Sequence, residues 1–321
     1  MKSIYMKKFE IIETDEYPSF DLKITLKPTF KCNQQCWFCS EFDNDTTEWS
    51  QQDIYTVMSK LKSISNNYKN KKVFIYFYGG EPTLHSQWEN MVYKLIDIFK
   101  ESNLYIQTQT NLSLSYKRLI QFAKEVQNKP TELCVSYHFG KQKIEEFIKK
   151  LKILEKYNIL GNIFVNTDYL NEEQFIKEFY ELINNFPLKV KMRFTEISTY
   201  KEGYPLGDLL HFEYRYFSKK YPQMLNYLEQ GFNFQIDDKV LNFADVLDQD
   251  INKQFRFMKC QCGSKNIVID HNLKVYHCND DFTNNINVYE LDIDFEDFLK
   301  TDIFCLNKAC YDGLEFTKYK T

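Results

Sequence analysis

The sequence predicts an α/β fold: a partial (β/α)6 TIM-like barrel followed by a small C-terminal α+β domain. Strand-like runs alternate with amphipathic helical segments, which implies parallel strands joined by right-handed crossovers. Six such units in about 190 residues are too few for a complete eight-unit barrel. At 321 residues, the chain also exceeds what one core usually holds, because single cores stop growing near about 250 to 300 residues.

The predicted strands are short apolar or aromatic runs, separated by helical segments. Ser50 and Asp53 form a capping signal before apolar residues at helical spacing in 54–64. The same spacing recurs in 144–154, and Asn171 with Gln174 is expected to open a further helix. The strands are predicted at Leu22–Leu26, Lys72–Tyr78, Leu104–Gln109, Glu132–Tyr137, Asn162–Thr167 and Lys189–Thr195.

Composition narrows the class of protein. A hydrophobic content of 43% with 17% aromatic residues excludes global disorder. The net charge of -4 without a long basic block disfavours nucleic acid as a partner. The sequence shows no signal peptide and no apolar stretch of about 18 residues, so we expect a cytoplasmic protein without a membrane partner. The nine cysteines are then expected to be metal ligands or reactive thiols rather than disulfides.

Cys32, Cys36 and Cys39 form a C-x-x-x-C-x-x-C array directly after the first predicted strand. An iron-sulfur cluster or a tetrahedral zinc ion normally takes four protein ligands, so three close thiolates indicate one metal position left open. Two other interpretations remain at this point. The array can begin a zinc site with a distant fourth ligand, or the cysteines can be buried thiols that pack as small hydrophobic residues.

A second motif, Gly79-Gly80-Glu81-Pro82, follows the predicted strand Lys72–Tyr78. The glycines allow positive φ or a close approach of the backbone to a ligand, and the proline stiffens the exit. A carboxylate at this point suits a cationic group. Taken alone, the tetrapeptide is also compatible with an ordinary turn.

With Phe38 before the third cysteine, the two motifs resemble those of the radical S-adenosylmethionine (SAM) superfamily. The resemblance implies a [4Fe-4S] cluster on Cys32, Cys36 and Cys39, with SAM bound to the open iron. Gly79, Gly80, Glu81 and Pro82 would line the methionine moiety, with the acidic side chain facing its ammonium group. The implied reaction is reductive cleavage of SAM to a 5'-deoxyadenosyl radical, with electrons from a flavodoxin- or ferredoxin-type donor.

Two further positions match this family more loosely. Thr110-Asn111 ends the third strand where relatives often carry T-N-G, but Leu112 replaces the glycine. The resemblance implies that Asn111 contacts the SAM carboxylate and that Ser136 lies near the ribose. His138 is a candidate substrate contact at the same strand end. The alternatives are a loop hydrogen bond, a polar strand-edge residue and a structural histidine.

The C-terminal cysteines resemble those of the SPASM and twitch domains appended to many radical SAM enzymes. The stretch Asn266 to Tyr276 reads as a hairpin, with Asn272 tolerating the left-handed conformation of its turn. The resemblance implies one auxiliary [4Fe-4S] cluster, while a zinc ribbon remains the alternative. The implied ligands are Cys260, Cys278, Cys305 and Cys310.

Two cysteines are candidates for returning a hydrogen atom to the substrate. Cys262 is the better candidate, and its alternative role is that of a cluster ligand or an idle thiol. Cys134 lies on a predicted barrel strand, so it is more readily explained as a packed core residue.

The predicted organisation is an N-terminal extension at 1–20, a radical SAM core at 21–225 and a SPASM/twitch-like auxiliary domain at 226–321. The resemblance implies an oxidoreductase or epimerase that abstracts hydrogen from an unactivated C–H bond of a peptide, leading to oxidation, crosslinking or epimerisation. The alternative substrate is a small molecule: a sugar, an aminosugar or a nucleotide. An alternative of another class is a zinc-stabilised binding protein.

Overall fold

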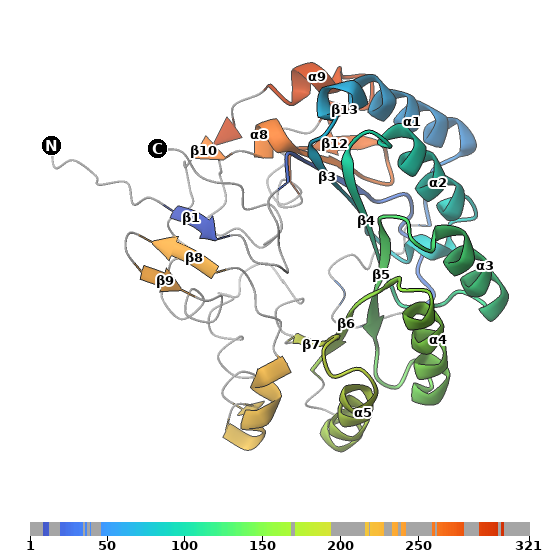
Figure 1. Cartoon of the computed structure of the whole chain (residues 1–321), viewed down its shortest axis with the longest axis vertical. Helices are drawn as coiled ribbons and strands as arrows, with labels where there is room; N and C mark the ends of the chain where they lie inside the picture. The colour runs from blue at the N-terminus through green and yellow to red at the C-terminus, as the bar shows by residue number, and fades with distance from the viewer. Residues whose placement is uncertain are drawn as a thin grey trace, which may run out of the picture.

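The structure of the chain is a computed structural model (Figure 1). It describes residues 9–12, 20–34, 36, 39, 46–167, 171–193, 216–217, 219–227, 233–236, 239–241, 259–260, 262–278, 289–300 and 303–304.

The centre of the molecule is a curved sheet of parallel strands. Six neighbouring strands pair in the order in which they follow along the chain. This confirms the predicted α/β class with a parallel sheet and all six predicted strands. The strands are β2 (Leu22–Leu26), β3 (Lys72–Phe77), β4 (Asn103–Thr110), β5 (Thr131–Tyr137), β6 (Leu160–Asn166) and β7 (Val190–Arg193).

Helices lie between these strands and cover the outer side of the sheet, as Figure 1 shows. The capping box predicted at Ser50 and Asp53 is present, with the Ser50 N–H donating to Asp53 Oδ2 at 2.7 Å and the Asp53 N–H donating back to Ser50 Oγ. The helices are α1 (Gln51–Ser65), α2 (Trp88–Ile98), α3 (Tyr116–Val126), α4 (Ile144–Lys156) and α5 (Glu172–Asn185).

Helix α5 opens directly after Asn171, as predicted, but without a side-chain cap. Gln174 Nε2 instead donates to Glu178 Oε1 at 2.9 Å, one turn further along the same helix. The Asn and Gln therefore do not form the reciprocal pair that their spacing suggests.

The two faces of the sheet differ in chemistry. Residues such as Ile24, Ile75 and Ile106 are fully buried in the hydrophobic core beneath the helices. The opposite, inner face carries polar and aromatic side chains: Gln109 Nε2 donates to Ser136 Oγ at 2.6 Å, and Tyr76 stacks on Tyr78. A closed barrel normally fills its interior with layers of branched aliphatic residues. This partial barrel therefore presents a polar inner wall at which a ligand can bind.

The C-terminal part of the chain extends the same sheet. The predicted hairpin is present as β11 (Asn266–Ile269) and β12 (Lys274–Tyr276), and β11 pairs in parallel with β2. A further strand, β13 (Tyr289–Glu290), pairs with β12. The sheet then has nine strands in the order β13-β12-β11-β2-β3-β4-β5-β6-β7. This part of the predicted auxiliary region is thus attached directly to the edge of the barrel sheet.

The turn of this hairpin differs from the prediction. Leu273, not Asn272, has the left-handed backbone, with φ of +62°. Asp270 explains the difference, because its Oδ1 accepts hydrogen bonds from the N–H groups of Asn272 and Lys274 at 2.9 and 2.8 Å. These hydrogen bonds from Asp270 close the turn, and Leu273 is the residue that adopts the left-handed backbone conformation.

Shorter elements complete the described fold. None of the described helices is long and apolar enough to cross a bilayer. The remaining elements are the strands β1 (Phe9–Ile12), β8 (Asn233–Ile236), β9 (Lys239–Leu241), β10 (Lys259–Cys260) and β14 (Ile303–Phe304), the helices α8 (Cys262–Lys265) and α9 (Phe295–Phe298), and the 3-10 turns η1 (Asn66–Tyr68), η2 (Pro82–Leu84) and η4 (Pro222–Tyr227). Strands β1, β8 and β9 form one small sheet, and β10 pairs with β14.

Candidate functional site

The three N-terminal cysteines lie on the loop that follows β2. Cys36 is buried, whereas Cys32 and Cys39 are exposed, and the Cys39 N–H donates to the Cys36 carbonyl at 3.1 Å. Burial raises the pKa of the Cys36 thiol to about 12, and the negative charges of the Cys39 and Cys32 thiolates contribute to this rise. The three sulfurs are therefore near enough to influence one another electrostatically. Among the described residues, no three potential ligands are already gathered as a metal site.

His138 lies beside the second cysteine. It follows β5, and its Nδ1 is 3.4 Å from Cys36 Sγ. Burial lowers the pKa of His138 to about 4, and the Lys141 cation adds to the effect, so the imidazole is neutral at neutral pH. The structure thus places this predicted residue at the expected strand end, in contact with the cysteine loop.

Asn111 lies beside the first cysteine. Its Nδ2 donates to Asn33 Oδ1 at 3.0 Å and lies 3.8 Å from Cys32 Sγ. The next residue, Leu112, has φ of +59° and is buried. Leu112 thus takes the left-handed conformation that a glycine usually provides after such a strand end.

Gly79 and Gly80 bring β3 against the stem of the cysteine loop. A Cβ on Gly80 would lie 2.4 Å from the Phe30 carbonyl oxygen and 2.5 Å from that of Lys31. The N–H of Glu81 donates to the same Lys31 carbonyl at 2.8 Å, and Gly79 has φ of +115°. The predicted close approach of the backbone is therefore an approach to the cysteine loop.

Glu81 and Pro82 complete this motif. Pro82 begins the turn η2, and Glu81 caps it by accepting from the Thr83 N–H at 3.1 Å. Burial raises the pKa of the Glu81 carboxyl, while hydrogen bonds from Thr83, Asn111 and Thr110 oppose the rise. The carboxylate that we expected to face a ligand is thus enclosed by protein donors.

Ser136 and Cys134 lie on β5, toward the inner face of the sheet. Ser136 is half-buried and accepts the hydrogen bond from Gln109. Cys134 is fully buried, and its Sγ lies 3.4 Å from Glu132 Oε1. A Cβ on Gly161 of the next strand would come within 2.6 Å of this sulfur. The packing of Cys134 fits its interpretation as a core residue.

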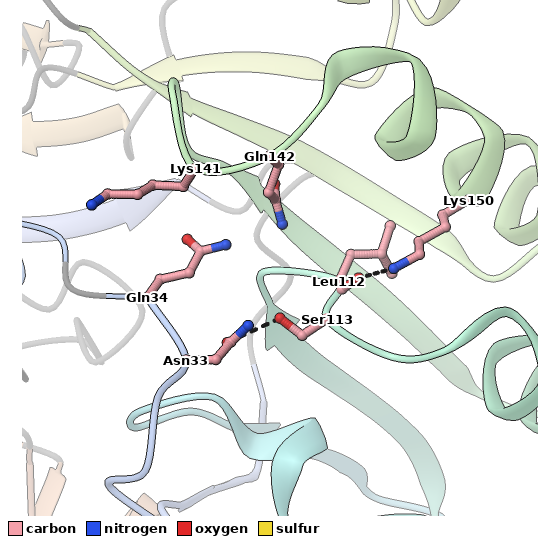
Figure 2. A pocket seen from close by; sticks show the side chains of 7 residues that line it. All are labelled: Asn33, Gln34, Leu112, Ser113, Lys141, Gln142 and Lys150. Carbon is pink, nitrogen blue, oxygen red and sulfur yellow. Dashed lines mark hydrogen bonds between the residues drawn. The ribbon is translucent and has the colours of Figure 1, made fainter.

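A pocket of about 410 Å³ opens beside the cysteine loop (Figure 2). Its volume lies in the range of about 300 to 1,000 Å³ that is typical of small-molecule sites. Lys150 Nζ donates to the Leu112 carbonyl at 2.9 Å at one side. The wall has two lysines and no acidic side chain, which favours an anionic group. The lining residues are Asn33, Gln34, Leu112, Ser113, Lys141, Gln142 and Lys150.

Sequence patterns did not reveal this pocket. Its lining residues come from three separate loops and from α4, which carries Lys150, and no single motif joins them. The only available signal was position, because each loop follows the carboxyl end of a parallel strand, where ligands commonly bind. Gln142 shows how specific the packing is, since its Nε2 donates to the Asn111 carbonyl.

The predicted auxiliary ligands are described only in part. Cys278 follows the hairpin and is half-buried. For Cys260, in β10, and Cys262, in α8, only the backbone element is described. Cys305, Cys310 and the predicted Phe38 lie outside the described residues.

The chain resembles known proteins in both sequence and fold. Residues 26–184 match the radical SAM superfamily. The chain is similar in structure to native anSMEcpe with bound AdoMet and Kp18Cys peptide, with 16% identity, a TM-score of 0.54, and coverage of 87% of this chain and 80% of the other. It is also similar to Streptococcus suis SuiB bound to precursor peptide SuiA, with 16% identity, a TM-score of 0.54, and coverage of 89% and 66%. At these identities the similarity establishes the fold. No curated protein matches the chain.

Proposed function

Because residues 26–184 form a radical SAM domain, we propose that this enzyme cleaves SAM reductively and uses the resulting radical to modify a peptide. When bound, a [4Fe-4S] cluster supplies the electron that splits SAM into methionine and a 5'-deoxyadenosyl radical. That radical removes a hydrogen atom from an unactivated C–H bond of the substrate. The protein contributes binding, orientation and exclusion of water.

The arrangement of three thiols on one loop carries this proposal. Cys32, Cys36 and Cys39 lie on the loop at the carboxyl end of β2. The negative charges of Cys32 and Cys39 contribute to the raised pKa of Cys36. Three thiolates match the protein ligands of a cluster that keeps one iron open. A cysteine binds iron as the thiolate, so its thiol must first lose a proton. The raised pKa of Cys36 in the metal-free protein means that cluster binding would release a proton there.

The inner wall of the sheet supports a substrate site. Tyr76 and Ser136 are half-buried on this wall and are linked through Gln109. Hydroxyl and amide groups of this kind can bind the polar backbone of an extended peptide. The similar structures of anSMEcpe and SuiB were determined with bound peptides, which favours a peptide over a sugar or nucleotide.

We further propose one auxiliary [4Fe-4S] cluster on Cys260, Cys278, Cys305 and Cys310. It would take up the electron that substrate oxidation leaves behind. A flavodoxin- or ferredoxin-type protein is the proposed donor for the first cluster. Cys262 is the proposed hydrogen-atom donor if the outcome is epimerisation.

The first experiment is anaerobic purification followed by iron analysis and a cleavage assay. We expect brown protein with about eight irons per chain, the sum of two four-iron clusters. With SAM and dithionite it should release 5'-deoxyadenosine without any substrate. Cys36→Ala should abolish this release, whereas the matched control Cys134→Ala, which also removes a buried thiol, should retain it. Colourless protein, or unaltered release by Cys36→Ala, contradicts the proposal.

Substrate class is tested by isotope transfer. A pool of deuterated short peptides should pass deuterium into 5'-deoxyadenosine. If deuterium arrives only from deuterated sugars or nucleotides, the small-molecule alternative holds. Cys278→Ala should lower the iron content to about four per chain, and a zinc content of one per chain instead contradicts the auxiliary cluster.

A further inference from the structure

The carboxylate of Glu81 is enclosed by donors from its own chain. Only 1% of the residue is exposed. Oε1 accepts from the Thr83 N–H and from the hydroxyls of Thr83 and Thr110. Oε2 accepts from the Asn111 N–H at 2.6 Å. Four donors therefore meet at one side chain, and they come from the turn η2 and from the carboxyl end of β4 with the residue that follows it.

Two of these donors order the end of β4. The Thr110 hydroxyl lies 2.7 Å from Glu81 Oε1 and itself accepts from the Leu112 N–H at 2.9 Å. Thr110, Asn111 and Leu112 are thus all tied to Glu81, directly or through one hydroxyl. A leucine adopts the left-handed backbone of Leu112 only where its surroundings impose it. The Glu81 carboxylate is part of those surroundings.

Asn111 extends this order to the first cysteine. Its side-chain amide donates to Asn33 Oδ1 and contacts Cys32 Sγ. Ser113 Oγ donates to the same Asn33 oxygen at 3.0 Å. A single residue, Asn111, therefore connects Glu81 to the Cys32 sulfur. The Asn111 backbone N–H is bound by the Glu81 carboxylate, and the Asn111 side chain contacts the sulfur.

We propose that Glu81 is a positioning residue, which fixes Asn111 and through it the Cys32 segment of the loop, and does not itself contact bound SAM. The proposal rests on the proposed function, because it concerns the site at which SAM would bind. It replaces our initial expectation that this carboxylate faces the SAM ammonium group. Each hydrogen bond to a charged acceptor is stronger than a neutral one, so the carboxylate form is suited to this role.

The first test uses metal-free protein and does not depend on cluster or SAM. Glu81→Gln keeps the shape of the side chain but places an NH2 donor where an oxygen accepted hydrogen bonds. We expect amide hydrogen exchange at Asn111 and Leu112 to become about tenfold faster or more, because a charged acceptor is lost. The matched control is Glu89→Gln, which removes a carboxylate paired with Arg118 on α2 and α3 and should leave both amides unchanged. Unchanged exchange in Glu81→Gln overturns the proposal.

The second test separates positioning from direct SAM contact in the loaded enzyme. Thr110→Val removes the hydroxyl between Glu81 and Leu112 without changing the carboxylate. If Glu81 acts by positioning, both variants alter the electron paramagnetic resonance spectrum of the reduced cluster before SAM is added. Their effects on the SAM dissociation constant are then less than additive in the double variant.

If Glu81 contacts SAM directly, Glu81→Gln weakens SAM binding at least tenfold with an unchanged SAM-free spectrum, and Thr110→Val behaves as wild type. That outcome overturns the proposal. If Glu81→Gln does not fold, Thr110→Val alone tests the proposal. Faster amide hydrogen exchange at Leu112 in Thr110→Val then supports the positioning role, and unchanged exchange overturns it. Wild-type protein that never releases 5'-deoxyadenosine contradicts the proposed function, while the exchange measurements still decide the role of Glu81.

Discussion

The indole N–H of Trp49 donates a hydrogen bond of 2.9 Å to the backbone carbonyl of Asp270. Trp49 follows the cysteine loop, and Asp270 directly follows β11 in the C-terminal hairpin. His85 Nε2 contacts the Trp49 carbonyl at 2.9 Å, and the Phe30 ring packs on His271 at 3.8 Å between centroids. The hairpin therefore supports the loop that carries the cysteines.

Trp49→Phe tests this connection. We expect it to lower the free energy of unfolding by about 1 kcal/mol more than Trp88→Phe does, since a net hydrogen bond contributes about 0.5 to 1.5 kcal/mol. Trp88 is a matched control, because it is equally buried and its Nε1 has no hydrogen-bond partner in the described part of the chain. Urea unfolding of the two variants measures the difference. Equal losses of stability would show that the bond to Asp270 contributes nothing.

Gly80→Ala should disrupt the contact between β3 and the cysteine loop. Its Cβ would meet two carbonyl oxygens, of Phe30 and Lys31, and backbone atoms cannot move aside as a flexible side chain can. We expect a loss of about 3 kcal/mol or more, or no folded protein. Gly140→Ala is the control for the steric clash, because no atoms lie within 4 Å of the Cβ position of Gly140, which unlike Gly80 has positive φ. Its expected cost is about 1 kcal/mol. Soluble yield and urea midpoints compare the two, and similar values would refute the steric argument.

Leu112→Gly separates backbone strain from side-chain burial. The left-handed backbone costs a leucine about 1 to 2 kcal/mol, which glycine releases. The buried side chain is lost as well, at about 2 to 5 kcal/mol. Leu114→Gly loses a similarly buried leucine without positive φ. Leu112→Gly should therefore be less destabilising by about 1 to 2 kcal/mol in thermal unfolding, and the opposite order would contradict this account.

Removal of iron should leave the sheet intact. The three cysteines lie on a loop, and the pairing of β2 with β3 and β11 does not pass through them. We expect chelation of the anaerobic protein to abolish 5'-deoxyadenosine release and lower the melting temperature, while the far-ultraviolet circular dichroism spectrum is retained. Loss of that spectrum would instead indicate a fold that depends on its metal, as in small zinc domains.

The sequence alone was sufficient for the local features of this protein. The six parallel strands, the capping box at Ser50 and the hairpin at Asn266 depend on periodicity and on neighbours a few residues away. The cysteine array and the Gly79-Gly80 pair could be recognised because their spacing in the chain is fixed. Each of these features is decided by short-range geometry, which the order of residues specifies directly.

Only the tertiary structure decided which distant residues meet. No local pattern places β11 beside β2, Trp49 against Asp270, or the Glu81 carboxylate beneath the Asn111 N–H. Such contacts depend on which sheet edge is available and on how separate loops pack at one end of the strands. A buried charge must find its donors in whatever surrounds it after folding, so the partners of Glu81 follow from the assembled sheet and not from the residues next to it.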